Sequence, residues 1–118
     1  MGHLSTHVLD IMNGCPAAGM AVTLQRLDGG NPVTLASFKL NEDGRHGGGP
    51  LLDAHSMAAG HYRLMFEVAA YFRARGIDLP EPPFIDVVQL DFGIADAAGH
   101  YHVPLLTSPW AYSTYRGS

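Results

Sequence analysis

Apolar and polar residues alternate through most of this chain, which is the pattern of β-strands that bury one face. The clearest alternation covers residues 100–107. Its even-numbered residues, which we expect to point away from the core, are His100, His102, Pro104 and Leu106. Its odd-numbered residues, which we expect to form part of the core, are Tyr101, Val103, Leu105 and Thr107. This stretch therefore predicts a strand that presents two histidines outside the core.

Six further stretches predict strands, because they are rich in β-forming residues and are bounded by turn residues. They cover residues 4–11, 20–27, 33–40, 61–68, 84–94 and 111–117. The turn sequence at 28–31 predicts a hairpin between the strands on either side of it. Ser108 and Pro109 predict a tight return that makes the last two strands antiparallel neighbours.

The only helix that we expect covers residues 69–75, AAYFRAR, and ends at the glycine cap Gly76. Seven or eight short strands with one short helix predict an all-β fold, a two-sheet antiparallel β-sandwich. A chain of 118 residues is long enough for one core and too short for two, so residues 1–118 are expected to form a single domain.

Charge and composition exclude several classes of function. The net charge is −4 and no run of lysine or arginine occurs, which argues against binding to nucleic acid or to an anionic membrane surface. No apolar run approaches the roughly 20 residues that span a bilayer, and no basic region precedes an apolar segment at the amino terminus. The sequence therefore predicts a cytoplasmic protein. Cys15 is the single cysteine, so no internal disulfide can form.

Candidate chemistry is concentrated in the histidines and in two arginines. His7 lies within the first predicted strand, on a face with Ser5 and Leu9, and alternation does not decide which face is buried. Arg45 precedes a glycine-rich segment, and Arg116 lies near the end of the chain. Considered alone, each has an ordinary interpretation as a surface or hydrogen-bonded polar residue.

Several motifs, taken together, favour a functional interpretation of these residues over the ordinary one. In chain order they are STHVLD at 5–10, GCPA at 14–17, NEDGR at 41–45, HYHVPLL at 100–106 with Ser108-Pro109, and YSTYRGS at 112–118. This series, which runs through essentially the whole chain, resembles the 5-hydroxyisourate hydrolase branch of the transthyretin-like family. The closing Tyr-Arg-Gly-Ser is its most specific part.

The resemblance implies a transthyretin-like β-sandwich that assembles as a homotetramer, with active sites in a channel where dimers meet. It implies the catalytic residues His7, Arg45, His102 and Ser118. It implies substrate contacts from His7, Arg45, Tyr115, Arg116 and Gly117, and a channel wall that includes Pro104, Leu106 and Ser113. It implies neither a metal nor a cofactor.

The implied reaction is hydrolytic opening of the six-membered ring of 5-hydroxyisourate at its cyclic amide. The product is 2-oxo-4-hydroxy-4-carboxy-5-ureidoimidazoline, a step in urate breakdown. Arginine suits a planar, partly anionic heterocycle because its fork donates two parallel hydrogen bonds. A histidine with a pKa of about 6.5 can take a proton from water at neutral pH. Which of His7 and His102 is the base is left open by the sequence.

Two other functions are compatible with parts of the pattern. Transthyretin itself is a carrier of hydrophobic hormones, but it does not keep these histidines or the Tyr-Arg-Gly-Ser ending. His7, His100 and His102 could in principle supply the three nitrogen ligands of a catalytic zinc. No carboxylate in the sequence is arranged as an obvious partner for such ligands.

Overall fold

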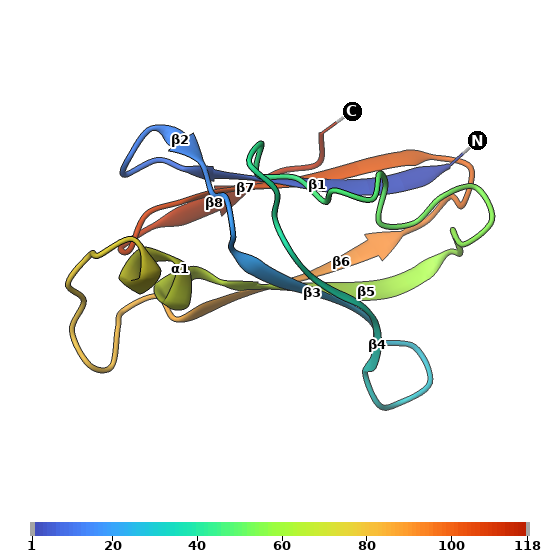
Figure 1. Ribbon diagram of the computed structural model, residues 1–118. Helices are drawn as coiled ribbons and strands as arrows, with labels where there is room; N and C mark the ends of the chain where they lie inside the picture. The colour runs from blue at the N-terminus through green and yellow to red at the C-terminus, as the bar shows by residue number, and fades with distance from the viewer. Residues whose placement is uncertain (1, 118) are drawn as a thin grey trace.

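Two four-stranded sheets lie face to face in the computed structural model, which describes residues 2–117 (Figure 1). Sheet A has the strand order β2-β1-β7-β8 and consists of β1 (His3–Asp10), β2 (Cys15–Pro16), β7 (His100–Thr107) and β8 (Tyr112–Thr114). Sheet B has the order β4-β3-β5-β6 and consists of β3 (Ala21–Arg26), β4 (Val33–Lys39), β5 (Gly60–Glu67) and β6 (Val87–Ile94). The helix α1 (Val68–Ala74) follows β5 directly. The predicted two-sheet sandwich with one short helix is confirmed.

The core lies between the sheets and is formed by alternate residues of each strand. In sheet A, the even-numbered residues of β1 and the odd-numbered residues of β7 are buried, which confirms the predicted core face of residues 100–107. The opposite surface, called here the outer face of sheet A, is formed by the odd-numbered residues of β1 and the even-numbered residues of β7. His7 is on this outer face, which settles the question that alternation left open.

One pair of strands departs from the antiparallel arrangement. β1 and β7 run parallel, with His3 opposite His100 and Asp10 opposite Thr107. All of sheet B separates these strands along the chain, so no tight turn restricts their relative direction. The two predicted local pairs, β3 with β4 and β7 with β8, are antiparallel as expected.

Several boundaries differ from the predicted ones for local reasons. The segment at 12–16, expected to be a turn, ends in the short strand β2, which pairs with the end of β1. The strand expected from residue 84 begins at Val87, and the Asp86 carbonyl just before it accepts the Ala69 N–H of α1. The last strand is shorter than predicted and ends at Thr114. The glycine cap of α1 is confirmed, since Gly76 has φ +84° and its N–H donates to the Arg73 carbonyl.

The carboxylate of Asp10 fastens α1 to sheet A. Asp10 is fully buried, and the Tyr71 hydroxyl donates to its Oδ2 atom at 2.8 Å. Burial alone would raise the pKa of Asp10, but hydrogen bonds from Asn13 and Tyr71 outweigh burial and hold that pKa below its usual range. Burial and the same carboxylate raise the pKa of Tyr71. Among the residues described, no helix has the length and apolar character needed to cross a membrane.

Candidate active site on the outer face of sheet A

The parallel pairing of β1 and β7 brings His7 and His102 close together. Ser5 lies opposite His102 and His7 lies opposite Pro104, so the two imidazoles project from the same face of adjacent strands, two positions apart. The two histidines come from opposite ends of the sequence, and the ladder between β1 and β7 is what makes them neighbours. This juxtaposition forms the centre of the candidate site.

Arg45 is held beside β1, next to the point where the short pairing of β1 with β2 ends. It forms an isolated bridge with His7, and the Val8 N–H donates to the Gly44 carbonyl at 3.0 Å. Gly44 has φ +73°, and a Cβ atom there would lie 2.6 Å from the Val8 carbonyl oxygen. Asn41 Oδ1 accepts the Arg45 N–H at 3.0 Å, which fixes the turn from the other side. The loop therefore approaches β1 closely at the level of His7.

The carboxyl-terminal tail approaches His102 from the opposite edge. Gly117 forms an isolated bridge with His102, and its N–H donates to the His102 carbonyl at 2.7 Å. A Cβ atom at Gly117 would lie 2.7 Å from Cδ2 of the imidazole, so only glycine fits here. Ser118 lies outside the described residues, and its predicted catalytic role stays a prediction.

The remaining predicted site residues lie in three different places. Pro104 and Leu106 are on the outer face of β7, and Ser113 is paired with Leu106 on the neighbouring strand. Tyr115 is 61% exposed and, with Arg116 and Gly117, borders an open pocket beside His100. Arg116 is placed differently, since its guanidinium lies over the ring of Tyr101, a residue of the core face.

Burial and nearby positive charge keep both imidazoles neutral at neutral pH. Burial lowers the pKa of His7 from its ordinary value of 6.5, and the positive charge of Arg45 lowers it further. Burial also lowers the pKa of His102, again with contributions from Arg45 and from His7. Neutral imidazoles can accept a proton from water or donate a ring N–H to a substrate.

A hydrogen bond orients the ring of His102, because Ser5 Oγ lies 2.8 Å from its Nδ1 atom. At His7, the backbone of Asp43 raises the pKa and partly opposes the larger effect of burial. Sequence reasoning did not identify Ser5 as part of the site. Its position two residues before His7, on the same strand face, was the signal that could have found it.

Additional imidazoles surround this centre. The rings of His3 and His100 are 4.2 Å apart between centroids. His46, next to Arg45, lines a pocket together with His3, Ser5 and Pro50. Within residues 2–117, no three His, Cys, Asp or Glu side chains are grouped as ligands for a metal ion, so the geometry gives no support to the zinc alternative.

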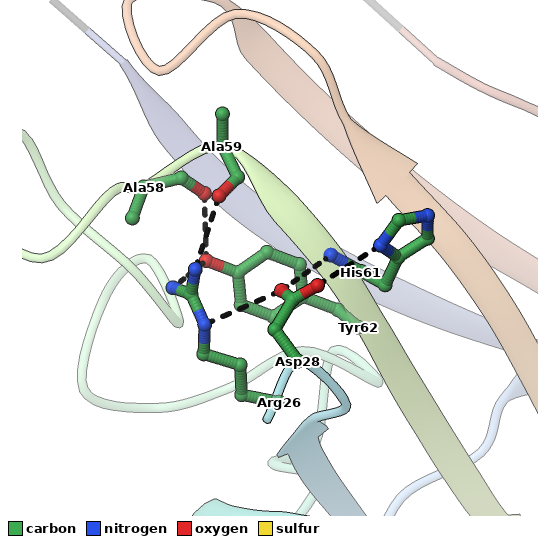
Figure 2. Close-up of polar contacts among 6 residues, drawn as sticks. All are labelled: Arg26, Asp28, Ala58, Ala59, His61 and Tyr62. Atoms are coloured by element: carbon green, nitrogen blue, oxygen red, sulfur yellow. Dashed lines mark hydrogen bonds and ion pairs between the residues drawn. The ribbon is translucent and has the colours of Figure 1, made fainter. Parts of the chain in front are cut away.

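A second polar cluster lies at one end of sheet B and shares no residue with this site (Figure 2). Asp28 accepts the His61 backbone N–H at 2.9 Å and contacts Nδ1 of His61 at 3.0 Å. Hydrogen bonds from His61 hold the pKa of Asp28 below its usual range. Arg26 donates to the Tyr62 hydroxyl, which in turn donates to the Ala58 carbonyl. These bonds fasten the segment before β5 to the end of β3, which is a structural role.

The fold and the site together define a transthyretin-like β-sandwich with paired histidines on one outer face. Residues 4–117 match the HIUase/Transthyretin family, and the chain belongs to that family. A 5-hydroxyisourate hydrolase from Ralstonia nicotianae is 51% identical over 118 residues, covering 100% of both chains.

Solved structures agree with this membership. The Klebsiella pneumoniae 5-hydroxyisourate hydrolase is 39% identical, with a TM-score of 0.81 over 100% of both chains. Sea bream transthyretin, solved in complex with thyroxine, is 28% identical, with a TM-score of 0.83 over 97% of this chain and 93% of that chain. The backbone is thus shared with a hydrolase and with a transthyretin, whereas sequence identity is greater with the hydrolases.

Proposed function

We propose that this chain is a hydrolase that opens the six-membered ring of 5-hydroxyisourate at its cyclic amide. The product would be 2-oxo-4-hydroxy-4-carboxy-5-ureidoimidazoline. The observation that supports this function is the convergence of His7, Arg45 and His102, from three distant segments, on one face of sheet A. The identity of 51% with a named 5-hydroxyisourate hydrolase favours an enzyme over a carrier.

Arg45 is proposed to bind and orient the substrate. 5-Hydroxyisourate is planar and rich in carbonyl oxygens and ring nitrogens, so a planar guanidinium can donate two parallel hydrogen bonds to it. The bridge between Arg45 and His7 supports this role, because a ring bound by Arg45 would lie beside the imidazole. The same positive charge contributes to the low pKa of His7. Arg45 therefore serves both binding and the protonation state of the base.

His7 is proposed to be the general base. If one ring nitrogen donates to the Asp43 carbonyl, which would account for the upward effect of the Asp43 backbone on the pKa of His7, the other nitrogen is left as a proton acceptor. It would take a proton from water while the water oxygen attacks the carbonyl carbon of the cyclic amide. This assignment goes beyond the sequence, which did not distinguish the two histidines.

His102 is proposed to donate a proton to the ring nitrogen as the amide C–N bond breaks. If the Ser5 hydroxyl donates to Nδ1, the neutral imidazole keeps its proton on Nε2, where it can serve as a donor. Backbone N–H groups of the tail, or Ser118, would stabilise the oxyanion, and Tyr115 would pack against or hydrogen-bond the ring. No covalent intermediate is required.

Turnover of freshly prepared 5-hydroxyisourate, followed by the loss of its ultraviolet absorbance, tests this proposal. We expect rapid turnover by the unmodified protein, and a loss of about 10²- to 10⁴-fold in His7→Ala and in His102→Ala, because each removes a proton-transfer group. His61→Ala, on the exposed surface of sheet B, is the matched control and should leave turnover unchanged. A double variant of His7 and His102 with full activity would refute the assignment.

We also infer that residues 1–118 form a single domain and that the active form is a homotetramer. One continuous apolar cluster between the two sheets supports the first inference. Membership of the family supports the second, with the outer face of sheet A lining a channel between dimers. A cytoplasmic location stays a prediction of the sequence.

A further inference from the structure

We propose that Arg116 is a positioning residue that anchors the carboxyl-terminal tail through Tyr101, and that it does not contact the substrate. This inference rests on the proposed hydrolase function and refines it, because the sequence resemblance had placed Arg116 among the substrate contacts. Its effect on catalysis would be indirect, through the place of Gly117 beside His102.

The strand register places Arg116 on the side of sheet A opposite to the catalytic histidines. Leu105 is paired with Thr114, and His102, three residues earlier, is bridged to Gly117, three residues later. The tail therefore keeps the register of β8 up to Gly117. Since side chains alternate across a strand, Gly117 belongs to the outer face with His102, and Arg116 belongs to the inner face with Tyr101.

The contacts of Arg116 agree with that register. Its guanidinium carbon lies 4.2 Å from the centroid of the Tyr101 ring, which is a close cation–π contact. Its Nη2 atom donates to the His100 carbonyl at 3.0 Å. Arg116 borders the opening between β6 and the tail, together with Leu90 and Phe92, and also the open pocket beside His100. It does not line the pocket that contains Arg45.

Tyr101 is a rigid support for this contact. The residue is 7% exposed, and its hydroxyl accepts the backbone N–H groups of Ala95 and Asp96 at 3.1 and 3.2 Å. Both donors belong to the turn between β6 and β7, so the ring is fixed without the tail. A fixed ring lets the guanidinium dock at a single position with little loss of side-chain freedom.

The tail needs such an anchor because the β7 ladder is interrupted. In this register Tyr115 lies opposite Pro104, and proline has no N–H to donate to the neighbouring strand. The strand β8 accordingly ends at Thr114, and beyond it the tail is held to β7 by the backbone bond from Gly117 to His102. We infer that Arg116 supplies the stabilisation that the missing ladder bond would have given.

Hydrogen exchange of the peptide covering residues 112–118 tests the anchor without any substrate. We expect Arg116→Met to speed exchange at the Gly117 amide about tenfold, because a cation–π contact and a hydrogen bond are lost. Arg73→Met is the matched control, since Arg73 Nη2 likewise donates to a carbonyl, that of Pro80, at 3.0 Å. It should leave exchange of the tail unchanged. Unchanged exchange in Arg116→Met would overturn the anchor.

Steady-state kinetics separate an anchor from a substrate ligand. We expect Arg116→Met to lower kcat about tenfold while KM changes less than about twofold, and Arg116→Lys to restore most of the loss by keeping a cation over the ring. In a Tyr101→Leu background, Arg116→Met should cost less than about twofold, because the support is already missing. An equal loss in both backgrounds would show that Arg116 acts without Tyr101 and would refute the proposal.

The two measurements also separate this inference from the proposed function. If the unmodified protein does not turn over 5-hydroxyisourate, the hydrolase function fails, yet the exchange experiment still decides whether Arg116 holds the tail. If turnover is rapid and exchange does not respond to Arg116→Met, the function stands and the anchor fails.

Discussion

At the scale of single residues, the two histidines have different neighbours. The Asp43 backbone raises the pKa of His7 against the effect of burial, whereas the Ser5 hydroxyl is hydrogen-bonded to Nδ1 of His102. Burial and Arg45 keep both rings neutral at neutral pH. A pair of identical side chains can thus divide the roles of base and acid because their partners differ.

The pH dependence of kcat/KM follows from these shifts. A base works while unprotonated, so activity should be level near neutral pH and fall only as the pH drops through the lowered pKa, below 6.5. Arg45→Gln removes a positive charge, so its acid limb should move up toward 6.5, whereas Arg45→Lys should keep it low. Profiles measured from about pH 5 to 8 test this. An acid limb above 6.5 in the unmodified protein would contradict it.

At the scale of elements, the site is assembled along the two sides of the β1–β7 pair, beyond the short strands β2 and β8. The segment before Arg45 docks on β1, and the tail docks on β7. A glycine lies at each docking point. A Cβ atom at Gly44 would meet the backbone of Val8, and a Cβ atom at Gly117 would meet the ring of His102. Strand edges offer unpaired backbone groups, so short segments can bind there without forming full strands.

Gly44→Ala tests the first docking point. The new Cβ would meet the Val8 carbonyl oxygen at 2.6 Å in a left-handed conformation, so the loop should shift and Arg45 with it. We expect kcat/KM to fall about tenfold or more, since small misplacements of a positioning group are costly. Gly14→Ala is the matched control, because Gly14 has φ +68° and a Cβ there would meet no other atom of residues 2–117 within 4 Å.

The Gly14→Ala control should keep its kcat/KM. Its free energy of unfolding, measured with denaturant, should fall by about 1 kcal/mol, because alanine is strained in the left-handed conformation. Equal kinetic effects of the two alanines would show that close contact with Val8 does not set the position of Arg45.

At the scale of the whole molecule, the candidate site is open in a single chain. Arg45 and Tyr115 are exposed, and the histidines are only half-buried. A hydrolytic site gains from exclusion of bulk water, because electrostatic interactions strengthen in a drier environment. A second pair of subunits covering the outer face of sheet A would provide that exclusion and would lower the histidine pKa values further.

Assembly is therefore predicted to be necessary for activity. Sedimentation velocity should give a particle of four chains, and specific activity should fall on dilution in parallel with dissociation of that particle. Far-ultraviolet circular dichroism of the same samples is the control for folding, and its β-sheet signal should persist if only the assembly is lost. Full specific activity in a sample that sediments as a monomer would refute the inference.

The sequence alone determined the local features of this protein. Period-two alternation defined the core face of residues 100–107 and the outward direction of His102, because each depends only on neighbouring residues. Turn residues defined the hairpin of β3 and β4, and Gly76 defined the end of α1. The predicted strand at 111–117 also puts the adjacent residues Arg116 and Gly117 on opposite faces, because successive side chains of a strand alternate.

Tertiary structure decided what these features form together. The parallel pairing of β1 with β7 is encoded by packing between strands at opposite ends of the chain, and no local period specifies it. That pairing places His7 beside His102, and the docking of Gly44 on Val8 brings Arg45 to them. A side chain's face follows from its immediate neighbours, whereas its partners follow from the free energy of the whole fold.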